Sequence, residues 1–374
     1  MNLYTQRVQH LRNELSEAGY DGCALLPGAN FAYYTGQFKF IDLLTTVLYI
    51  PAAGVTNVDR PVLLITGFEE YTTVSAMPYP VDAIPYERNA DGYAEGFSQF
   101  ADKVGLDRAH VGVESTGMRF LEAQMLQSAA PNLKLEAIDT VLSGIRAIKS
   151  ADEIELIRHA DRITEQALDG IFSQIKSGMT EIELRNRFHI ELLRAGAEGT
   201  GFDSIVVSGP RGALQHATPS DRAIQPGDAI LFDVGARYHG YTADITRTVV
   251  LGPVSDEFQA IYAIVREANA AARAAVRPGT IAHDVDLAAR DVIERAGYVE
   301  TFTHGTGHGL GLDVHEPPRI APGDQTVLRP GMVFTIEPGI YLRERFGARI
   351  EDDVTVTENG YDRLTSFSHD LVIL

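Results

Sequence analysis

The sequence has one cysteine, Cys23, among 374 residues, so no disulfide can form within the chain. A lone cysteine of this kind is most often a small core residue. Long apolar runs are also missing, since no stretch approaches the roughly 20 apolar residues that a membrane-spanning helix needs. The N-terminal segment is amphipathic and lacks the continuous apolar core of a signal peptide. We therefore expect a cytoplasmic protein without a membrane span.

Positive charge is the second scarcity of the sequence. Lys and Arg number 32 against 51 Asp and Glu, which gives a formal net charge of −19. Such a field repels phosphate backbones and anionic lipids, and this argues against nucleic acids and membrane surfaces as partners. Many proteins use excess carboxylates for solubility, but some of these could hold cations. Hydrophobic residues at 45% and charged residues at 22% are ordinary globular values, which excludes a disordered or fibrous chain.

The length and a change of pattern near residues 141–150 predict two domains, 1–141 and 150–374. In the first, short apolar runs alternate with helical periodicity, which predicts a small α/β domain. Its expected strands are Cys23–Leu26, Val47–Ile50, Val62–Ile65 and Val111–Glu114, and its expected helices are Leu3–Ala18, Ala94–Val104 and Phe120–Ala129. It contains no dense cluster of catalytic residue types, so we expect it to serve packing, oligomerisation or substrate gating.

The second domain opens with a long helical pattern whose N-cap is Ser150, with Glu153 three residues on, as in a capping box. We expect this helix to end at Gly178. Further elements are expected at Thr180–Ala195, Ile230–Leu251, Asp256–Val276 and Ile281–Ala296, the second of them β-rich and the others helical. Two helix pairs interleaved with strands indicate an internal structural duplication within an α+β domain.

Asp233 and Asp244 lie in two β-rich runs, Ile230–Ala236 and Tyr241–Leu251, that flank a Tyr-His-Gly turn sequence. A turn centred just after Tyr238 would place the two carboxylates directly opposite each other, with Cβ atoms about 5 Å apart. Like charges at that spacing repel unless a cation lies between them. The pair is therefore a candidate for metal binding.

Three histidines, His304, His308 and His315, lie within twelve positions of the glycine-rich segment THGTGHGLGLDVHEPPRI. The glycine spacing does not fit the phosphate-binding pattern G-x-G-x-x-G, and glycines instead let backbone approach a site closely. One histidine would usually be structural, whereas three in so short a segment indicate a site.

Two more carboxylates follow. Glu337 ends an apolar strand pattern, where a buried charge needs a partner. Arg349, Glu351 and Asp353 alternate with apolar residues, which predicts one strand with the three charges on one face. A surface ion pair between Arg349 and Glu351 is the alternative interpretation.

Asp233, Asp244, Glu337 and Glu351 with one imidazole form an oxygen-rich donor set that suits hard cations. Two divalent cations balance the four carboxylates and leave room for a bridging hydroxide. A single imidazole disfavours the thiolate- or His-rich sites of structural zinc. We expect two metal ions, Mn²⁺ or Co²⁺ before Fe²⁺ or Zn²⁺, that lower the pKa of a shared water and polarise a carbonyl oxygen.

At these residues the chain resembles the pita-bread metallopeptidases, a family that includes methionine aminopeptidase, aminopeptidase P and prolidase. The motifs of all five ligand positions occur in the family's order, and the resemblance covers the chain from about residue 150. Residues 1–141 resemble the creatinase/prolidase N-terminal domain, which methionine aminopeptidases lack. The resemblance implies a pita-bread catalytic domain preceded by a smaller α/β domain, and specificity for proline.

The resemblance also implies which residues hold the metals. Asp233 would bind one ion and His308 the other, while Asp244 and Glu351 would bridge the two. Glu337 would bind the His308 metal and handle the proton of the attacking water.

Other residues would meet the substrate. The segment GALQHATPSD resembles a family motif and makes His216 the substrate-side histidine. With His304 and His315, it would donate hydrogen bonds to the scissile amide or to the developing oxyanion. Arg349 would anchor a substrate carboxylate, and Tyr341 would close the wall of the site.

The implied activity is hydrolysis of the Xaa-Pro bond at a free N-terminus. The compact length and the fourteen-residue step from Glu337 to Glu351 favour dipeptides, as in prolidase, over the longer peptides of an Xaa-Pro aminopeptidase. A related amide hydrolase of a small non-peptide substrate is a further alternative. A metal-free amidinohydrolase or a non-catalytic binding scaffold would have lost ligand residues that are present here. We expect a homodimer, in which the aromatic-rich segment 31–44 could reach the partner's site.

Overall fold

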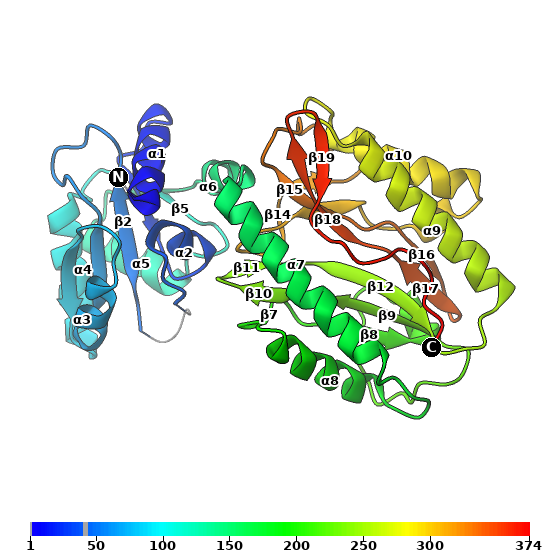
Figure 1. Cartoon of the computed structure of the whole chain (residues 1–374). Helices are drawn as coiled ribbons and strands as arrows, with labels where there is room; N and C mark the ends of the chain where they lie inside the picture. Colours follow the sequence, from blue (N-terminus) through cyan, green and yellow to red (C-terminus); the bar gives the residue numbers. More distant parts are fainter. Residues whose placement is uncertain (1, 40–43) are drawn as a thin grey trace. The chain divides into compact units, whose positions relative to one another are not determined.

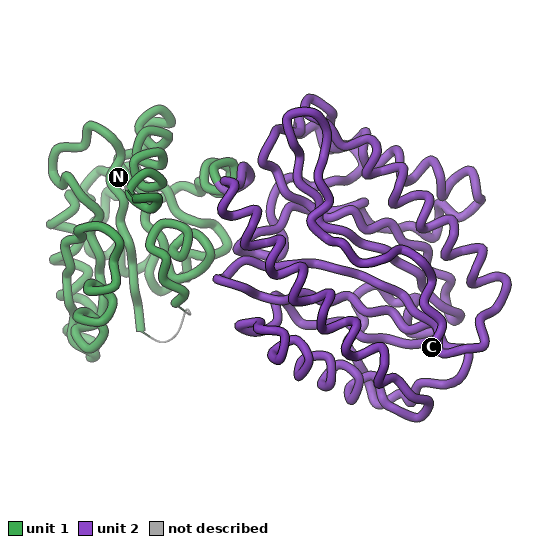
Figure 2. Tube along the Cα trace, in the orientation of Figure 1, with its two compact units in different colours: residues 1–145 green, residues 146–374 purple. Residues whose placement is uncertain are grey.

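The computed structural model describes residues 2–39 and 44–374. The chain divides into two compact units, Met1–Ile145 and Arg146–Leu374, which Figure 2 colours separately. None of the described helices combines the length and the apolar composition that crossing a membrane requires.

The first unit is built on a six-stranded sheet with the strand order β4-β3-β2-β1-β5-β6. The strand β2 is antiparallel to both of its neighbours, β1 and β3, while β4, β5 and β6 join their neighbours in parallel. The strands are β1 (Gly22–Leu25), β2 (Val47–Pro51), β3 (Val62–Thr66), β4 (Asp82–Tyr86), β5 (His110–Val113) and β6 (Lys134–Ala137). The four predicted strands are confirmed as β1, β2, β3 and β5. The edge strands β4 and β6 were missed because they are only partly buried and contain no continuous apolar run.

Helices precede and follow these strands (Figure 1). They are α1 (Leu3–Glu17), α2 (Ala29–Thr35), α3 (Gly67–Ser75), α4 (Ala90–Val104), α5 (Phe120–Ala129) and α6 (Asp139–Ala147). The predicted helices are confirmed as α1, α4 and α5. The core of the unit joins Phe97 and Phe100 of α4 to strand residues such as Leu64 and Val111, all of them fully or almost fully buried.

The second unit contains two helix pairs with strands between them (Figure 1). The pairs are α7 (Ala151–Phe172) with α8 (Glu181–Arg194), and α9 (Asp256–Ala275) with α10 (Ala282–Arg295). One core forms where α7 and α8 cover strands within residues 205–250, and another where α9 and α10 cover strands within residues 316–357. The mixed α+β architecture that the sequence predicts is confirmed.

The strands of this unit form several small sheets. Their orders are β11-β10-β7, β12-β9-β8, β14-β13-β15-β18-β19 and β16-β17. The bounds are β7 (Gly199–Thr200), β8 (Ile205–Ser208), β9 (Ala229–Val234), β10 (Ala236–Tyr238), β11 (Tyr241–Thr242), β12 (Ile245–Val250), β13 (Gly307–Gly309), β14 (Glu316–Ile320), β15 (Val333–Ile336), β16 (Gly339–Leu342), β17 (Phe346–Arg349), β18 (Asp352–Thr357) and β19 (Gly360–Arg363).

The capping box of α7 is confirmed: the Glu153 amide donates to the Ser150 hydroxyl, and the Ser150 amide donates to the Glu153 carboxylate. The predicted end of this helix at Gly178 is wrong, because the helix stops at Phe172. The amide of Ile175 donates to the carbonyl of Phe172 in a tight turn, and the Ile175 side chain stays buried. The apolar spacing therefore continues through a buried turn after the helix has ended.

The strands β9 and β12 pair in a register that places Asp233 opposite Thr246, so the prediction that Asp233 lies directly opposite Asp244 is wrong. The turn residues are His239 and Gly240, whose φ angles of 46° and 79° are both positive, as in the type I′ turn of a two-residue hairpin. This turn is centred one residue later than predicted, which shifts each cross-strand pair by two positions. Since Asp244 precedes Thr246 by two residues, alternation makes it a diagonal neighbour of Asp233 on the same face.

Gly235 connects β9 to β10 at the point where the hairpin passes the site. A Cβ atom there would lie 1.8 Å from the carbonyl oxygen of Ala243. We expect Gly235→Ala to lower the free energy of unfolding by at least about 2 kcal/mol, because the two strands must separate. Urea denaturation followed by circular dichroism measures the loss. The control is Gly144→Ala in α6, where a Cβ meets nothing within 4 Å and helix propensity predicts a neutral or stabilising change. Equal stability of the two variants would contradict the packing argument.

Candidate metal site and active-site cavity

A cavity of about 440 Å³ lies within the second unit, between the two halves of its core. Apolar residues such as Phe202, Ile205 and Val314 form part of its wall. Nine of the ten predicted site residues line it: Asp233, Asp244, His308, Glu337 and Glu351, the histidines His216, His304 and His315, and Arg349.

Five separate segments bring the predicted ligands together. Asp233 is in β9, Asp244 directly precedes β12, His308 is in β13, Glu337 directly follows β15, and Glu351 lies between β17 and β18. Main-chain hydrogen bonds fix the ends of these strands. The Glu337 amide donates to the Thr306 carbonyl at 2.7 Å, and the Glu351 amide donates to the Thr246 carbonyl at 3.1 Å.

The prediction that one strand carries Arg349, Glu351 and Asp353 is wrong, because β17 ends at Arg349 and β18 begins at Asp352. The chain changes partners at this break, since β17 pairs with β16 whereas β18 pairs with β15 and β19. Glu351 lies in the break, where its amide reaches Thr246 of β12. Both Arg349 and Glu351 are buried, at 3% and 1% exposure, which excludes the alternative of a surface ion pair.

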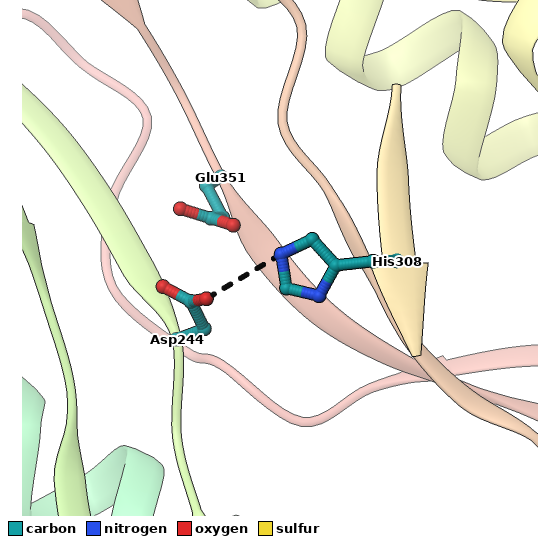
Figure 3. A group of neighbouring side chains, drawn as sticks. All are labelled: Asp244, His308 and Glu351. Atoms are coloured by element: carbon teal, nitrogen blue, oxygen red, sulfur yellow. Dashed lines mark ion pairs between the residues drawn. The ribbon is translucent and has the colours of Figure 1, made fainter. Parts of the chain in front are cut away.

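Asp244, His308 and Glu351 converge most closely (Figure 3). One ligand atom of each lies within 4.8 Å of the others, a spacing that one ion could bridge. The Nε2 atom of His308 is 3.7 Å from Asp244 Oδ2 and 3.5 Å from Glu337 Oε1. Figure 3 shows the imidazole and the two carboxylates pointing toward one another from different segments of the chain.

The electrostatics of these groups fit divalent cations. Burial raises the pKa of Asp244 and of Glu337 well above the usual range, and the neighbouring Glu351 adds to both effects. Among the described residues, Asp244 Oδ1 is buried and has no hydrogen-bond partner. Burial lowers the pKa of His308 to about 4, so its imidazole is neutral and can donate a lone pair. Crowded carboxylates with one neutral imidazole form the donor set of a hard metal ion.

Arg349 compensates part of this negative charge. Its Nη2 donates to Asp233, its Nε donates to the Thr246 hydroxyl at 3.0 Å, and its Nη1 donates to the Tyr341 hydroxyl at 2.9 Å. The Thr246 hydroxyl in turn donates to Glu351 at 2.6 Å. Three of the five guanidinium N–H groups of Arg349 are thus engaged within the protein, and Thr246 connects Arg349 to the carboxylate of Glu351.

His304 joins the same network through Tyr341. Its Nδ1 lies 2.7 Å from the Gly305 carbonyl, which can only accept, so Nδ1 carries the proton. Burial lowers the pKa of His304 to about 3, which leaves Nε2 unprotonated and able to accept from the Tyr341 hydroxyl at 2.8 Å. Both ring nitrogens of His304 are therefore used within the protein. Tyr341 does not line the 440 Å³ cavity but an adjoining one of about 940 Å³ that shares Gln215.

His216 and His315 also line the cavity, and the protein engages them less than it engages His304. The His315 ring lies 4.2 Å from the His308 ring, and burial lowers the pKa of His315. His216 makes no hydrogen bond with any residue in the described part of the chain. Both side chains are partly exposed to the solvent that enters the cavity.

Arg319 is a cavity residue that the sequence interpretation missed. It is exposed on β14, where burial alternates, and its guanidinium has no hydrogen bond or ion pair with another described residue. Alternation places His315, Pro317 and Arg319 on one face, so the period-2 pattern after His315 could have identified it. An unpaired positive charge in an acidic cavity is a ready binding group for an anion.

Comparison with known proteins assigns both units. Residues 155–358 match metallopeptidase family M24, and residues 7–148 match the creatinase/prolidase N-terminal domain. An Xaa-Pro dipeptidase of Pyrococcus horikoshii is 40% identical over 342 residues, which cover 90% of this chain and 97% of that protein. The structure of a prolidase from Thermococcus sibiricus matches with a TM-score of 0.92 and 36% identity, and covers 100% of both chains. An X-Pro aminopeptidase from Thermotoga maritima matches with a TM-score of 0.86 and 31% identity over 100% of both chains.

Because these carboxylates are buried, the stability of the protein without bound metal, measured in the presence of a chelator, should depend on pH. Burial, with Asp233 as the next cause, raises the pKa of Glu351 from 4.5 to about 8. A group whose pKa is raised in the folded state stabilises the fold at pH values below its ordinary pKa. This contribution is lost as the pH rises through the folded-state pKa. We expect the melting temperature in chelator to fall between about pH 4.5 and 8 for this reason. Added Mn²⁺ should raise it more at pH 8 than at pH 5.

Glu351→Gln is the matched variant for this measurement. It should flatten the pH dependence in chelator and reduce the gain from Mn²⁺, since it removes one titrating group and one candidate ligand. A gain from Mn²⁺ that is independent of pH, or unchanged in the variant, would contradict the assignment of these carboxylates to a cation site.

Proposed function

The chain belongs to metallopeptidase family M24, and we propose that it is an exopeptidase that hydrolyses the Xaa-Pro bond of dipeptides. The dipeptidase and prolidase relatives support the substrate class. The observation that carries the preference for dipeptides is Arg319, an unpaired guanidinium that lines the cavity. A dipeptide places its terminal carboxylate one residue beyond the scissile bond, whereas a longer peptide places a neutral amide there.

We propose that two divalent cations are held by Asp233, Asp244, His308, Glu337 and Glu351, with Mn²⁺ the first choice and Co²⁺, Fe²⁺ and Zn²⁺ as alternatives. The oxygen-rich donor set supports this order. When bound, such ions supply an acidified water and polarise a carbonyl oxygen. The remaining steps belong to residues of the chain.

Glu337 is the proposed proton carrier. Burial among other carboxylates raises its pKa, which suits a group that takes a proton from the attacking water and holds it on a carboxylate oxygen. The proton then passes to the proline nitrogen as the C–N bond breaks. This nitrogen belongs to a tertiary amide, so it has no N–H of its own that could compete for the carboxylate.

The proposed roles of the other residues follow from their hydrogen bonds. Arg349 and Tyr341 hold Asp233 and His304 in place, because their polar groups are engaged with one another. We therefore propose Arg319, in place of Arg349, as the anchor of the substrate carboxylate. His216 and His315 remain available to donate hydrogen bonds to the substrate carbonyl.

We propose a cytoplasmic homodimer, as expected from the sequence. Part of the aromatic-rich segment 31–44 that could reach a partner's site, residues 40–43, lies outside the described residues. The alternative function is an Xaa-Pro aminopeptidase of longer peptides, which the likeness to the Thermotoga maritima enzyme favours. A related hydrolase of a small non-peptide amide is a further alternative.

Two substrates separate these functions. We expect metal-dependent release of alanine from Ala-Pro, much slower release from Ala-Pro-Ala, and neither reaction in chelator. Alanine release is followed for both peptides with the Mn²⁺-loaded protein. Faster cleavage of the tripeptide would identify an aminopeptidase, and cleavage of neither would point to a non-peptide substrate.

Replacing Arg319 tests the carboxylate anchor. We expect Arg319→Gln to raise KM for Ala-Pro by about 10–100-fold, since a charge-assisted hydrogen bond contributes about 1.5–3 kcal/mol. Steady-state kinetics should show a much smaller effect on Ala-Pro amide, which has no carboxylate. Arg187→Gln, on the exposed side of α8, removes the same charge outside the cavity and is the control. Equal losses on both substrates would argue that Arg319 does not meet the carboxylate.

A further inference from the structure

We propose that Glu181 is a positioning residue that fixes the loop carrying His216, defined here as residues 209–219 and including a short 3₁₀ helix at Gly209–Ala213. The proposal rests on the proposed function, because it assumes that His216 acts on the substrate. Glu181 is the first residue of α8 and its side chain is completely buried, yet it lies outside the metal-site cavity.

Five hydrogen bonds converge on the Glu181 carboxylate. Its Oε1 accepts from the amide of Ser208 at 2.7 Å and from the Ser208 hydroxyl at 2.9 Å. Its Oε2 accepts from the amide of Ser220 at 2.9 Å, from the Ser220 hydroxyl at 2.7 Å and from Arg211 Nε at 2.9 Å. Ser208 and Ser220 are the residues on either side of the loop, so one carboxylate holds both of its ends.

Main-chain contacts close the base of the loop in the same place. The amides of Glu181 and Ile182, in the first turn of α8, donate to the carbonyls of Arg222 and Ser220. These are amides that a helix start leaves without partners inside the helix. Within the loop, Arg211 also donates to the Thr218 carbonyl. The loop is therefore tied to the beginning of α8 at both its ends, and Arg211 connects Glu181 to the Thr218 carbonyl.

His216 has no comparable anchor of its own. It is exposed to the cavity, and it makes no hydrogen bond with the described residues 2–39 and 44–374. Its position is therefore set by the loop backbone, in contrast to that of His304, whose two ring nitrogens are both engaged. A misplacement of about 1 Å in a group that acts on the substrate can cost about 100-fold in rate.

The carboxylate is specifically required because all five partners are donors. An ionised carboxylate only accepts, whereas the amide of glutamine would turn two donors toward other donors. Glu181→Gln keeps the shape of the side chain and removes this complementarity. The matched control is Glu183→Gln, two residues along the same helix, where the exposed Glu183 side chain caps the Thr180 amide and does not contact the loop.

The test combines hydrogen exchange with a double-mutant cycle on the Mn²⁺-loaded protein. In Glu181→Gln, we expect amide exchange of residues 208–220 to accelerate at least tenfold and kcat for Ala-Pro to fall about 10–100-fold, with a smaller change in KM. Glu183→Gln should change neither. In a His216→Ala background, Glu181→Gln should lower kcat by less than about twofold further, because it acts through His216.

Unchanged exchange in residues 208–220 would overturn the proposal, and so would losses in kcat that multiply in the double variant. If Glu181→Gln does not fold, Ser220→Ala weakens the same contact and is judged by the same measurements. If the wild-type chain does not hydrolyse Ala-Pro, the proposed function fails, while the exchange rates still decide whether Glu181 holds the loop.

Discussion

The structure depends on keeping four carboxylates close together in a buried place. Asp233, Asp244, Glu337 and Glu351 come from separate segments of the second unit, and Asp244 and Glu351 are almost completely buried. Burying a charge without a partner is costly, and burying several of one sign is more so. Arg349 offsets one of them through Asp233. The other carboxylates require protons or cations, and this requirement distinguishes a metal site from an ordinary core.

Other buried carboxylates of this unit are treated differently. Burial alone would raise the pKa of Asp352, but Arg247 and His369 outweigh it and hold the pKa far below the usual range. Lys149 and Arg146 likewise outweigh burial and lower the pKa of Glu316. These carboxylates have cationic side chains as partners, so they can stay ionised and join segments distant in sequence. Those at the cavity have fewer such partners and stay available for ions from solution.

Asp352 and Asp353 are adjacent residues that connect the ion-paired carboxylates to those at the cavity. Asp353, beside Asp352 on β18, accepts a hydrogen bond from the amide of Asp244 at 3.0 Å. Burial and the neighbouring Asp161 raise the pKa of Asp353. Arg247 meanwhile donates to the carbonyls of Thr246 and Glu351. The backbone at Asp244 and at Glu351 is thus fixed by buried side chains, which hold these two candidate ligands in place.

The sequence was sufficient to predict what local patterns and motifs encode. The strands with continuous apolar runs and the capping box at Ser150 follow from spacing and residue type. The resemblance to a known family assigned the acidic residues and histidines that line one cavity. The register of the hairpin could not be predicted, because the turn at His239 and Gly240 depends on two positive φ angles that a Tyr-His-Gly sequence does not fix. The hydrogen bonds of His304 could not be predicted either, because its partner Tyr341 is 37 positions away in the chain.

The charges at the cavity also bear on substrate length. Asp203 and Arg319 line it, and neither has a hydrogen bond or ion pair with another residue in the part of the chain described. A dipeptide at neutral pH is a zwitterion, and therefore brings one ammonium and one carboxylate to groups that lack partners. In the proposed binding mode, a longer peptide brings the same ammonium, but its carboxylate lies farther along and leaves Arg319 facing an amide. Since an unpaired charge in a partly desolvated cavity costs more than a paired one, the balance of charges favours the shorter substrate.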